Sequence, residues 1–419
     1  MGEEFLTLDD FDLRGKSVLV RVDINSPIDP STGRILNDSR IRSHIETIKD
    51  LGKSKSVILA HQSRPGKADF TTLEAHADKL SYLLGKRIKY VDSLFGSKAI
   101  RAIEEMRMGD AIILENARMF SEEIVLQNES LSKQSRSHIV RKLAPLVDVF
   151  VHDAFAAAHR SQPTLVGFSD VLTTVAGRVM ERELNSLNRF LGRVQEPNVA
   201  ILGGVKADDS VRITRNLLER KLVDKVLTAG MVGNLFLIAS GVEIGEGSVR
   251  FAKKEISDYE SVLKEAGSLM REYKNMIEVP MDVVANNRGK RKGMRVENLP
   301  TNLQISDIGL DTIVHYSDII GGSKSVIMNG PAGIFEIPEF SIGTSELMRA
   351  LAYSDAYTII GGGHTIAAAE HFDLTGKIDH VSTGGGSLME YLSGRKLPAI
   401  EALKKWKKRH SSSSASRKS

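Results

Sequence analysis

The sequence predicts an α/β protein with two doubly wound, parallel-sheet (Rossmann-like) domains joined by a helix. Short, continuously apolar runs alternate with segments of helical periodicity along the whole 419-residue chain. Strands buried on both faces are continuously apolar, and parallel strands need helical crossovers, so this alternation indicates parallel sheets with helices on both sides. The chain is long enough for two or three domains, and one long helical segment near the middle separates two series of β–α units.

The first series contains five runs that we expect to form strands. They are SVLVRVDIN (17–25), SVILAHQSRP (56–65), IKYVD (88–92), AIILENAR (111–118) and VDVFVHD (147–153). Two of the segments between them have helical spacing. SRIRSHIETIKDL (39–51) places isoleucines three and four residues apart, with Ser39 as the expected N-cap. Residues 71–85 follow the same pattern and end at Gly85, a residue that stops helices well.

The second series follows a helical segment at 176–196, which Pro197 ends and which we expect to be a hinge between domains. Its expected strands lie in VAILGGVK (199–206), KVLTAGMV (225–232), NMIEVPMDVVAN (275–286), SVIMNGPAG (325–333), YTIIGGGHT (357–365) and DHVSTGGG (379–386). The expected domains are therefore 1–175 and 197–390, and 391–419 is a separate closing segment.

Composition excludes several classes of protein. The chain has no cysteine, which rules out disulfides, thiolate catalysis and cysteine-ligated metals. No run approaches the roughly 18 apolar residues of a membrane span, and the acidic start lacks the features of a signal peptide, so we expect a cytoplasmic protein. The net charge is +4, and much of the basic excess lies in the tail 404–419. We expect this tail to be a solvated end; nucleic-acid binding is the alternative.

The two halves place different residue types after their strands. In the first half these are charged and amide groups, and guanidinium groups match the oxygens of phosphate and carboxylate. The candidates are Asp23, Asn25, His61, Arg64, Arg118 and Arg160. In the second half they are glycines, which let backbone N–H groups approach a nucleotide phosphate. Ligands of open α/β sheets bind beyond the carboxyl ends of strands, so the pattern predicts a phosphoryl-transfer enzyme with an anionic substrate on one half and a nucleotide on the other.

The least generic stretch is MNGPAGIFE (328–336). Asn329 can bond to a phosphate or a base edge, and Glu336 can accept hydrogen bonds from ribose hydroxyls. A strand–turn–helix junction with a chance acid is the plainer alternative. Neither the P-loop motif nor G-x-G-x-x-G after a strand is present, which argues against P-loop enzymes and dinucleotide dehydrogenases.

The motifs taken together resemble the phosphoglycerate kinase family, in order and over nearly the full chain, and several are closer to its archaeal branch. They are RVDINSP, NDSRIR (37–42), HQSRPG, ILENARMF (113–120), VFVHDAFAAAHR, AILGGVK, MNGPAGIFE, GGGHT and STGGGS. The resemblance implies a hinge-bending monomer that moves phosphate between 1,3-bisphosphoglycerate and ADP with Mg²⁺. It also implies that 1–175 binds the triose, that 197–390 binds ATP or ADP, and that 391–419 returns to the first domain.

The resemblance also implies a role for individual residues. The implied triose ligands are Asp23, Asn25, Arg40, His61, Arg64, Arg118 and Arg160. The implied nucleotide ligands are Lys206, Asn329, Glu336, Gly361, Gly362, Gly363, His364 and Thr365. Arg40 and Lys206 are the expected catalytic residues, because they would neutralise the transferred phosphoryl group.

Two positions depart from the wider family and leave the metal ligands open. Ser210 stands where most members outside the archaeal branch have a second lysine, and His364 stands where they have an aspartate. Hard cations prefer oxygen ligands, so His364 is a poor substitute for a carboxylate on Mg²⁺. Either the nucleotide phosphates and water hold the metal, or Asp208 or Asp209 contributes.

Three other interpretations are weaker. A kinase for acetate, carbamate or aspartate would not need so many arginines. A nucleic-acid-binding protein would use the basic tail, and its binding would depend steeply on salt. A catalytically inactive relative finds no support in the motifs of the first half.

Overall fold

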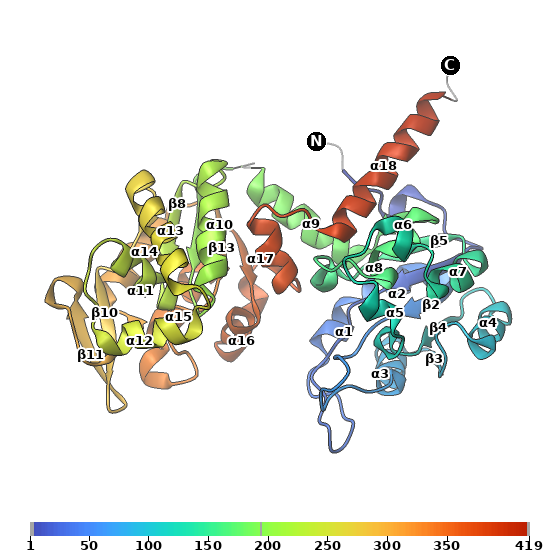
Figure 1. Ribbon diagram of the computed structural model, residues 1–419, viewed down its shortest axis with the longest axis horizontal. Coiled ribbons are helices and arrows are strands. Elements are labelled where there is room, and N and C mark those ends of the chain that lie inside the picture. The colour runs from blue at the N-terminus through green and yellow to red at the C-terminus, as the bar shows by residue number, and fades with distance from the viewer. Residues whose placement is uncertain (1–3, 193–194, 417–419) are drawn as a thin grey trace. The chain divides into compact units, whose positions relative to one another are not determined.

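The computed structural model describes residues 4–192 and 195–416, and the chain divides into two compact units (Figure 1). The first unit comprises Met1–Leu184 with Lys396–Ser419, and the second comprises Asn185–Arg395. The division falls inside helix α9 (Arg178–Leu191). Each unit contains a six-stranded parallel sheet, which confirms the predicted α/β class.

The sheet of the first unit has the strand order β3-β4-β2-β1-β5-β6. Its strands are β1 (Ser17–Arg21), β2 (Lys55–Leu59), β3 (Lys89–Val91), β4 (Ala111–Leu114), β5 (Val149–His152) and β6 (Thr173–Ala176). Arg21 pairs with Leu59 on one side and with His152 on the other, so the central strands end level with one another. The segments that follow these strands therefore start from one edge of the sheet.

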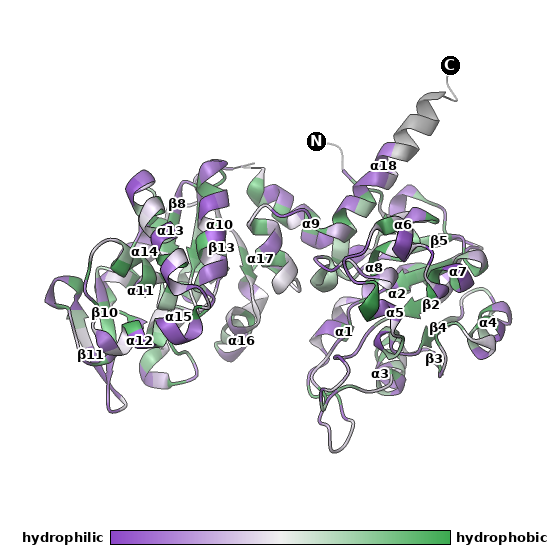
Figure 2. Ribbon diagram, viewed as in Figure 1, coloured by the Kyte–Doolittle hydropathy of each residue, from purple (hydrophilic) through white to green (hydrophobic). Residues whose placement is uncertain are grey.

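Both faces of this sheet are buried, which explains why its strands are continuously apolar. Along β1, Val18 and Val20 pack into one core, whereas Leu19 packs into another on the opposite face. Ile58 and Val57 of β2 divide in the same way. Figure 2 shows the strands as the most hydrophobic parts of the ribbon. Alternate residues thus serve two apolar layers, as a doubly wound sheet requires.

Helices of the first unit surround this sheet. They are α1 (Ser39–Ser43), α2 (Ile45–Asp50), α3 (Glu74–Leu84), α4 (Ser97–Glu104), α5 (Glu122–Val125), α6 (Leu131–Gln134), α7 (His138–Leu143), α8 (Pro163–Val166) and α18 (Pro398–Ser416). The helix predicted at 71–85 is confirmed as α3, and Gly85 caps it in the left-handed conformation. The continuous helix predicted at 39–51 is wrong in two respects: it is interrupted at His44, and its N-cap is Asp38 rather than Ser39.

The sheet of the second unit has the strand order β15-β14-β13-β7-β8-β9. Its strands are β7 (Asn198–Leu202), β8 (Lys225–Thr228), β9 (Ile277–Glu278), β13 (Ser325–Asn329), β14 (Tyr357–Gly361) and β15 (His380–Val381). Asn329 pairs with Leu202 on one side and Gly361 on the other, so the turns after β7, β13 and β14 begin side by side.

A second, antiparallel sheet in this unit was not expected from the sequence. It has the order β11-β10-β12, formed by β10 (Asp282–Asn287), β11 (Lys290–Arg295) and β12 (Gln304–Ile308). The single strand predicted at 275–286 divides around Pro280, which has no N–H group for a ladder. β11 was missed because it is a basic, mostly exposed edge strand rather than an apolar run.

Helices of the second unit complete its architecture. Besides the C-terminal half of α9 they are α10 (Ala207–Glu219), α11 (Gly230–Ala239), α12 (Glu246–Glu255), α13 (Tyr259–Glu272), α14 (Leu310–Gly321), α15 (Ile342–Ala352), α16 (Gly363–His371) and α17 (Gly386–Leu392). Helices α10, α11 and α16 each begin directly after a glycine-containing turn of the parallel sheet.

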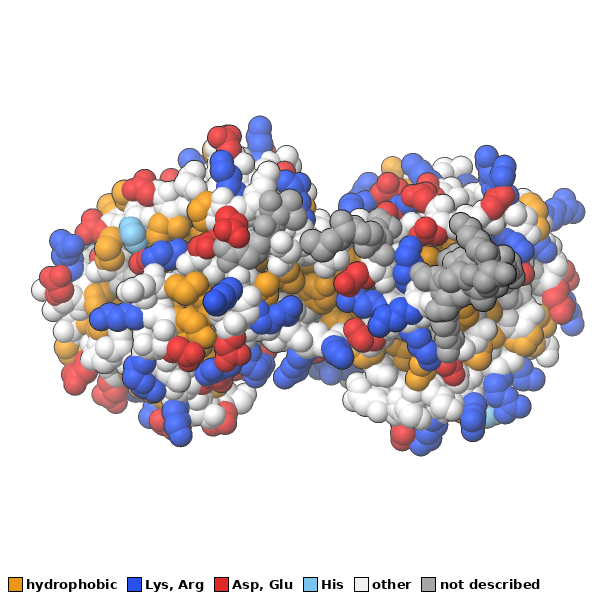
Figure 3. Space-filling model, turned by 90° about the horizontal axis from the view of Figure 1, so that it is seen from above, with side chains coloured by type: hydrophobic (Ala, Val, Ile, Leu, Met, Phe, Trp, Pro, Cys, Tyr) orange, Lys and Arg blue, Asp and Glu red, His pale blue; other side chains and the backbone are white. Residues whose placement is uncertain are grey.

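The end of the chain packs within the first unit through α18. The N–H of Ala399 donates to the carbonyl oxygen of Ala158 at 3.3 Å, and Nζ of Lys404 lies 2.6 Å from a carboxylate oxygen of Glu4. Side chains of both charges alternate over the surface in Figure 3, as expected from 57 basic and 53 acidic residues. Across the described residues, no helix has the length and apolar character needed to cross a membrane.

Candidate active site

The charged residues predicted for the first half gather at one edge of the first unit's sheet. β1, β2, β4 and β5 are neighbours with matched ends, and the loops after them surround a hollow of about 670 Å³. Asn25, Arg64, Arg118 and Arg160 line this hollow. We define the arginine cluster as these residues and those that interact with them: Arg21, Asp23, Asn25, Arg40, His61, Arg64, Arg118 and Arg160.

Asp23 is the carboxylate of this cluster. It is buried, and its Oδ1 lies 3.2 Å from Nη1 of Arg40, whose side chain is 38% exposed. Burial by itself raises the pKa of Asp23, but the positive charges around it, those of Arg40 and Arg21 among them, lower it by more. The pKa of Asp23 therefore lies below its usual value. Its carboxylate is ionised at neutral pH and can accept a hydrogen bond from a substrate hydroxyl group.

His61 is a buried ring between two arginines. Nη2 of Arg21 lies 3.1 Å from Nδ1, and Nη1 of Arg160 lies 3.5 Å from Nε2. Burial lowers the pKa of His61 well below its usual value, and the attraction of Asp23 does not offset this. His61 is therefore neutral at neutral pH. The positive charge that keeps Asp23 ionised then comes from the arginines.

Arg21 is a member of the cluster that the sequence pattern did not single out. It ends β1, its exposed fraction is 1%, and its Nε donates to Oγ1 of Thr164 at 3.2 Å. Its Nη1 donates to the carbonyl oxygen of Val22. Burial lowers the pKa of Arg21, while Glu123 opposes that shift. The sequence contains one indication of this role, because Arg21 lies inside the apolar run SVLVR and a buried charge requires polar partners.

Arg118 and Arg160 repel each other across the hollow. Burial, together with repulsion by Arg160 and Arg21, lowers the pKa of Arg118 to about 10. Burial also lowers the pKa of Arg160. Arg118 still carries its proton at neutral pH at that value. Because like charges are stabilised when an anion binds among them, this part of the fold suits a compact polyanion.

Two carboxamides hold the loops that carry these arginines. Oδ1 of Asn25 accepts from the N–H of Ser63 at 2.8 Å, and Ser63 has a left-handed backbone with φ 54. Oδ1 of Asn116 accepts from the N–H groups of Gln62 and Arg118 at 3.2 and 3.1 Å. Asn25 thus uses its oxygen to position the loop after β2, which leaves its amide N–H groups for a ligand.

The glycine turns of the second unit pack directly against one another. A Cβ atom on Gly330, whose φ is +92, would lie 2.1 Å from the carbonyl oxygen of Gly203. A Cβ on Gly203 would lie 2.5 Å from that of Pro331. The N–H groups of Gly203 and Gly204 donate to the carbonyl oxygens of Asn329 and Pro331 at 2.9 and 2.8 Å. Glycine is therefore needed here for contact between backbones, besides any contact with a phosphate.

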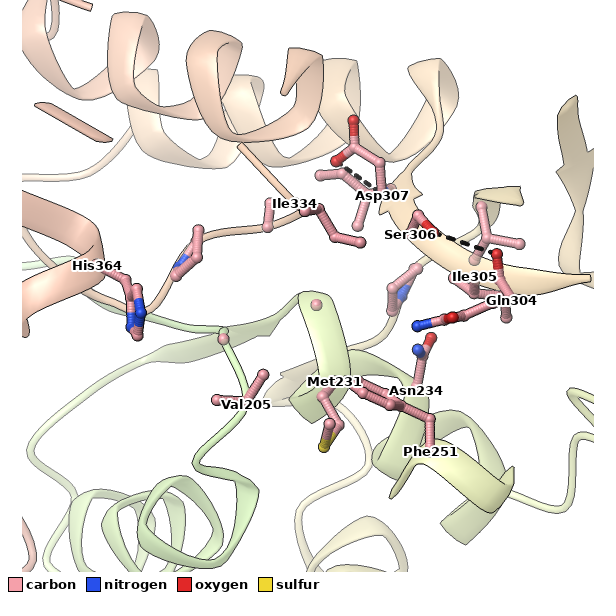
Figure 4. A pocket seen from close by; sticks show the side chains of 18 of the residues that line it. Val205, Met231, Asn234, Phe251, Gln304, Ile305, Ser306, Asp307, Ile334 and His364 are labelled. Atoms are coloured by element: carbon pink, nitrogen blue, oxygen red, sulfur yellow. Dashed lines mark hydrogen bonds between the residues drawn. The ribbon is translucent and has the colours of Figure 1, made fainter. Parts of the chain in front are cut away.

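A slot of about 300 Å³ lies beside these turns (Figure 4). Glu336 and His364, both predicted from the sequence, belong to its lining. The apolar part of the lining is formed by Val205, Met231, Phe251, Pro280, Val283, Ile305, Ile308, Pro331, Ala332 and Ile334. Polar residues that the sequence did not reveal are Asn234, Gln304, Ser306 and Asp307. Three of them lie on β12, a strand that was not predicted.

The predicted Asn329 and the loop 361–365 lie together at the ends of β13 and β14. Asn329 is buried, and its Nδ2 has no hydrogen-bond partner among the described residues. A Cβ on Gly362 would lie 3.2 Å from that nitrogen. Oγ1 of Thr365 accepts from the N–H of Gly330 at 2.7 Å, so Thr365 supports the turn. Gly361 is buried, whereas Gly363 and His364 are exposed. The unpartnered N–H of Asn329 requires an acceptor such as phosphate oxygen.

The acidic residues near Lys206 interact with an arginine of the same helix. Lys206 is exposed and precedes α10, which carries Asp208 and Asp209 in its first turn. Nη2 of Arg212 contacts Asp209 and lies 3.8 Å from Oδ2 of Asp208. Ser210 is buried next to them. In the part of the chain that the structure describes, no group of three or more histidine, cysteine or acidic residues is arranged to hold a metal.

Residues 8–395 match the phosphoglycerate kinase family. The chain is a member of the phosphoglycerate kinase family. It is 48% identical over 406 residues to the phosphoglycerate kinase of Thermoplasma acidophilum, covering 97% of this chain and 99% of the relative. It is also 48% identical over 408 residues to that of Methanothermus fervidus, covering 97% and 98%.

Solved structures of the family have the same architecture. The crystal structure of phosphoglycerate kinase from Pyrococcus horikoshii superposes with a TM-score of 0.87 at 37% identity, covering 96% of this chain and 99% of the other. The structure from Coxiella burnetii gives 0.79 at 31% identity, again covering 96% and 99%. The similarity to the archaeal branch expected from the motifs is thus confirmed.

Membership of this family defines the reaction. The chain catalyses the reversible transfer of a phosphoryl group between 1,3-bisphosphoglycerate and ADP, which gives 3-phosphoglycerate and ATP. The reaction belongs to glycolysis and gluconeogenesis and uses ATP or ADP with Mg²⁺. The predicted function and cofactors are therefore confirmed, whereas the roles of individual residues stay predictions.

Proposed function

We propose that the arginine cluster binds the triose substrate of this reaction. The observation that carries the proposal is the group of arginines that face one hollow, with Asp23 as the carboxylate among them. Arg64, Arg118 and Arg160 bind the phosphate, because guanidinium groups match its oxygens. Asp23 and the amide of Asn25 bind the hydroxyl group, and His61 donates to the triose from Nε2.

The slot of the second unit binds the nucleotide. Its apolar walls suit a purine base, and Glu336 accepts hydrogen bonds from the ribose. The unpartnered Nδ2 of Asn329 and the turn at Gly361–Gly363 bind the phosphates, together with Lys206 and His364. Thr365 contributes by holding this turn in place.

Arg40 and Lys206 neutralise the phosphoryl group during transfer. In the direction of ATP synthesis an oxygen of the ADP β-phosphate attacks the phosphorus, and the triose carboxylate leaves with the bonding electrons. No proton needs to move, because a carboxylate and a phosphate oxygen are both ionised at neutral pH. Catalysis then rests on alignment of the two substrates and on positive charge around the phosphoryl group.

The nucleotide phosphates and water would hold Mg²⁺ in this site. The described residues offer no cage of carboxylates, and Asp209 is already engaged by Arg212. The bound metal supplies charge neutralisation on the nucleotide phosphates. A Mg²⁺ titration of Asp208→Asn and Asp209→Asn tests this, and we expect both variants to follow the wild-type curve. A shift of the half-saturating Mg²⁺ concentration in either variant would assign that aspartate to the metal.

The two sites lie on different units, so the transfer requires them to approach. We propose that the segment 176–196, with α9, acts as the hinge, and that closure excludes water from the acyl phosphate. We also propose that 1–175 and 197–390 are the triose and nucleotide domains; within 391–419, the part from Lys396 onward belongs to the first unit. The protein acts as a cytoplasmic monomer that binds neither nucleic acid nor membrane. Absence of salt-sensitive RNA or DNA binding by the full chain would support that last point.

Binding calorimetry with the full chain tests the assignment of the two sites. We expect Arg64→Ala to weaken binding of 3-phosphoglycerate and leave ADP binding unchanged. We expect Asn329→Ala to have the opposite pattern. If both variants weakened both ligands alike, the division of the sites between the two units would be wrong. A coupled assay of ATP formation from 1,3-bisphosphoglycerate and ADP provides the matching measurement of activity.

A further inference from the structure

A chain of buried hydrogen bonds lies behind His61 and is not used by the substrate ligands themselves. It begins at Glu123 of α5, whose carboxylate accepts from the N–H of Thr164 at 3.0 Å and from its Oγ1 at 2.5 Å. Oγ1 of Thr164 accepts in turn from Nε of Arg21 at 3.2 Å. Nη2 of Arg21 then lies 3.1 Å from Nδ1 of His61. All four side chains are buried.

The direction of these bonds fixes the tautomer of His61. An arginine has only N–H donors, so the ring nitrogen that faces Arg21 must be the one without a proton. A neutral imidazole has one such nitrogen, and Arg21 and Arg160 both approach the ring. The Arg21 contact is the shorter one, 3.1 against 3.5 Å, and Arg21 is also held by Thr164 and Val22. Nδ1 is therefore the acceptor and Nε2 carries the proton.

This tautomer gives the triose site a donor that it would otherwise lack. With the proton on Nε2, both Nε2 of His61 and Nη1 of Arg160 are donors, and they cannot bond to each other. An acceptor oxygen placed near both satisfies them. With the proton on Nδ1, Nε2 would accept from Arg160, and the ring would offer nothing to an anionic ligand.

We propose that Thr164 and Glu123 are positioning residues of the triose site, which act through Arg21 to hold His61 with its proton on Nε2. The inference rests on the proposed binding of the triose by the arginine cluster. In its ionised form Glu123 also offsets the buried positive charge of Arg21; burial raises the pKa of Glu123, and Arg21 and Thr164 oppose that shift. Thr164 links the two because its hydroxyl group donates to Glu123 and accepts from Arg21 at the same time.

The test compares Thr164→Val, which has nearly the same shape but no hydroxyl group, with Thr164→Ser, which keeps it. In Thr164→Val we expect the dissociation constant for 3-phosphoglycerate to rise about tenfold, the effect of losing one hydrogen bond to a charged group. We expect the ¹⁵N spectrum of labelled histidine to lose the single Nε2–H form of His61. Thr164→Ser restores both properties, Glu123→Gln resembles Thr164→Val, and ADP binding is unchanged throughout.

Thr174→Val is the matched control, because Thr174 is an equally buried threonine of the same unit whose hydroxyl donates only to the carbonyl oxygen of Leu172. Equal loss of 3-phosphoglycerate binding in Thr164→Val and Thr174→Val would mean a general loss of structure and would overturn the proposal. So would an unchanged His61 spectrum in Thr164→Val. Arg64→Ala tests the triose site independently of Thr164 and Glu123. If Arg64→Ala left 3-phosphoglycerate binding unchanged, the proposed triose site itself would be wrong.

Discussion

Individual arginines in this protein are distinguished by what surrounds them. Arg118 and Arg160 are partly buried and face other positive charges, whereas Arg40 is paired with Asp23 at the edge of the cluster. Arginines that repel one another in the free protein are stabilised most when an anionic ligand binds among them. A group that touches only the transferred phosphoryl gains most in the transition state.

Arg40→Ala and Arg118→Ala are expected to affect different kinetic constants. Arg40→Ala should lower kcat by about 10³-fold, a loss typical of arginines that stabilise phosphoryl transfer. Arg118→Ala should instead raise the KM for 3-phosphoglycerate by about tenfold, because it removes a charge-assisted contact with the bound substrate. Steady-state kinetics with Arg136→Ala, an exposed arginine of the same unit, provide the control. Small and equal effects on both constants in both variants would refute this division of roles.

Asp307 is expected to make the stability of the protein depend on pH. Burial raises the pKa of Asp307 to about 6, although Gly343 and Arg291 oppose the shift. A carboxyl group whose pKa is raised by folding favours the folded state most when it is protonated. Its contribution is present below its unfolded pKa of about 4 and is lost as the pH rises through about 6.

The difference in unfolding free energy between wild type and Asp307→Asn should therefore change by about 2 kcal/mol between pH 4 and pH 7. The wild type should become less stable relative to the variant as the pH rises. Urea denaturation of both proteins without nucleotide measures it. A difference that stays constant over this range would show that Asp307 titrates normally.

At the scale of secondary-structure elements, the turns after β7, β8 and β13 depend on one another. Gly203, Gly230 and Gly330 each approach a backbone atom of another turn more closely than any Cβ atom would allow. One substitution therefore displaces two turns, and α10 and α11 begin directly after two of them. The nucleotide site is thus a property of the joined turns.

Gly330→Ala is expected to lower the unfolding free energy by more than about 2 kcal/mol and to weaken ADP binding. Alanine would have to adopt the left-handed backbone conformation of Gly330, which is unfavourable for it, and its methyl group would clash with the carbonyl oxygen of Gly203. Gly321→Ala is the control, since a Cβ there meets no atom within 4 Å. Denaturation and calorimetry measure the two effects. A Gly330→Ala protein as stable as Gly321→Ala would mean that these turns adapt freely.

Another link between elements runs from the triose site to α9. Nδ1 of His44 lies 2.6 Å from Oδ2 of Asp153, while Nε2 lies 3.1 Å from the backbone of Asp23. Oδ1 of Asp153 accepts from the N–H groups of Val179 and Met180 at the start of α9. The interruption of the helix at His44 is what makes this possible, because it turns the ring inward. The backbone of Asp23 and the proposed hinge helix are thus held by one buried pair.

At the scale of the whole molecule, the proposed triose and nucleotide sites lie on separate units, so the proposal requires the two units to approach for transfer. Small-angle X-ray scattering should show a smaller radius of gyration when 3-phosphoglycerate and ADP are both bound than when neither is. Each ligand alone serves as the control, because closure joins the two sites and should be greatest with both. An unchanged radius with both ligands would contradict hinge closure about α9.

Much of the site was predictable because it follows strands whose apolar runs are easy to recognise. Asp23, His61, Arg118 and Arg160 all lie in segments that follow such a run, and parallel strands with matched ends bring these segments to one edge. Arg21 was not singled out, since it lies inside the run. Gln304 and Asp307 were missed because polar residues interrupt the apolar residues of β12, QISDI, which therefore lacks a continuous apolar run. Asn234 was missed because it is a single polar residue within the apolar helix α11.

The sequence by itself determined the α/β class, the two series of β–α units, and the chemical difference between an arginine half and a glycine half. These follow from local order: which residue types succeed which strands. Only the tertiary structure decided that His44 pairs with Asp153, that Arg21 orients His61 through Thr164 and Glu123, and that glycine turns interlock. Such contacts join residues far apart in the chain, so they depend on how the layers pack and leave no local pattern.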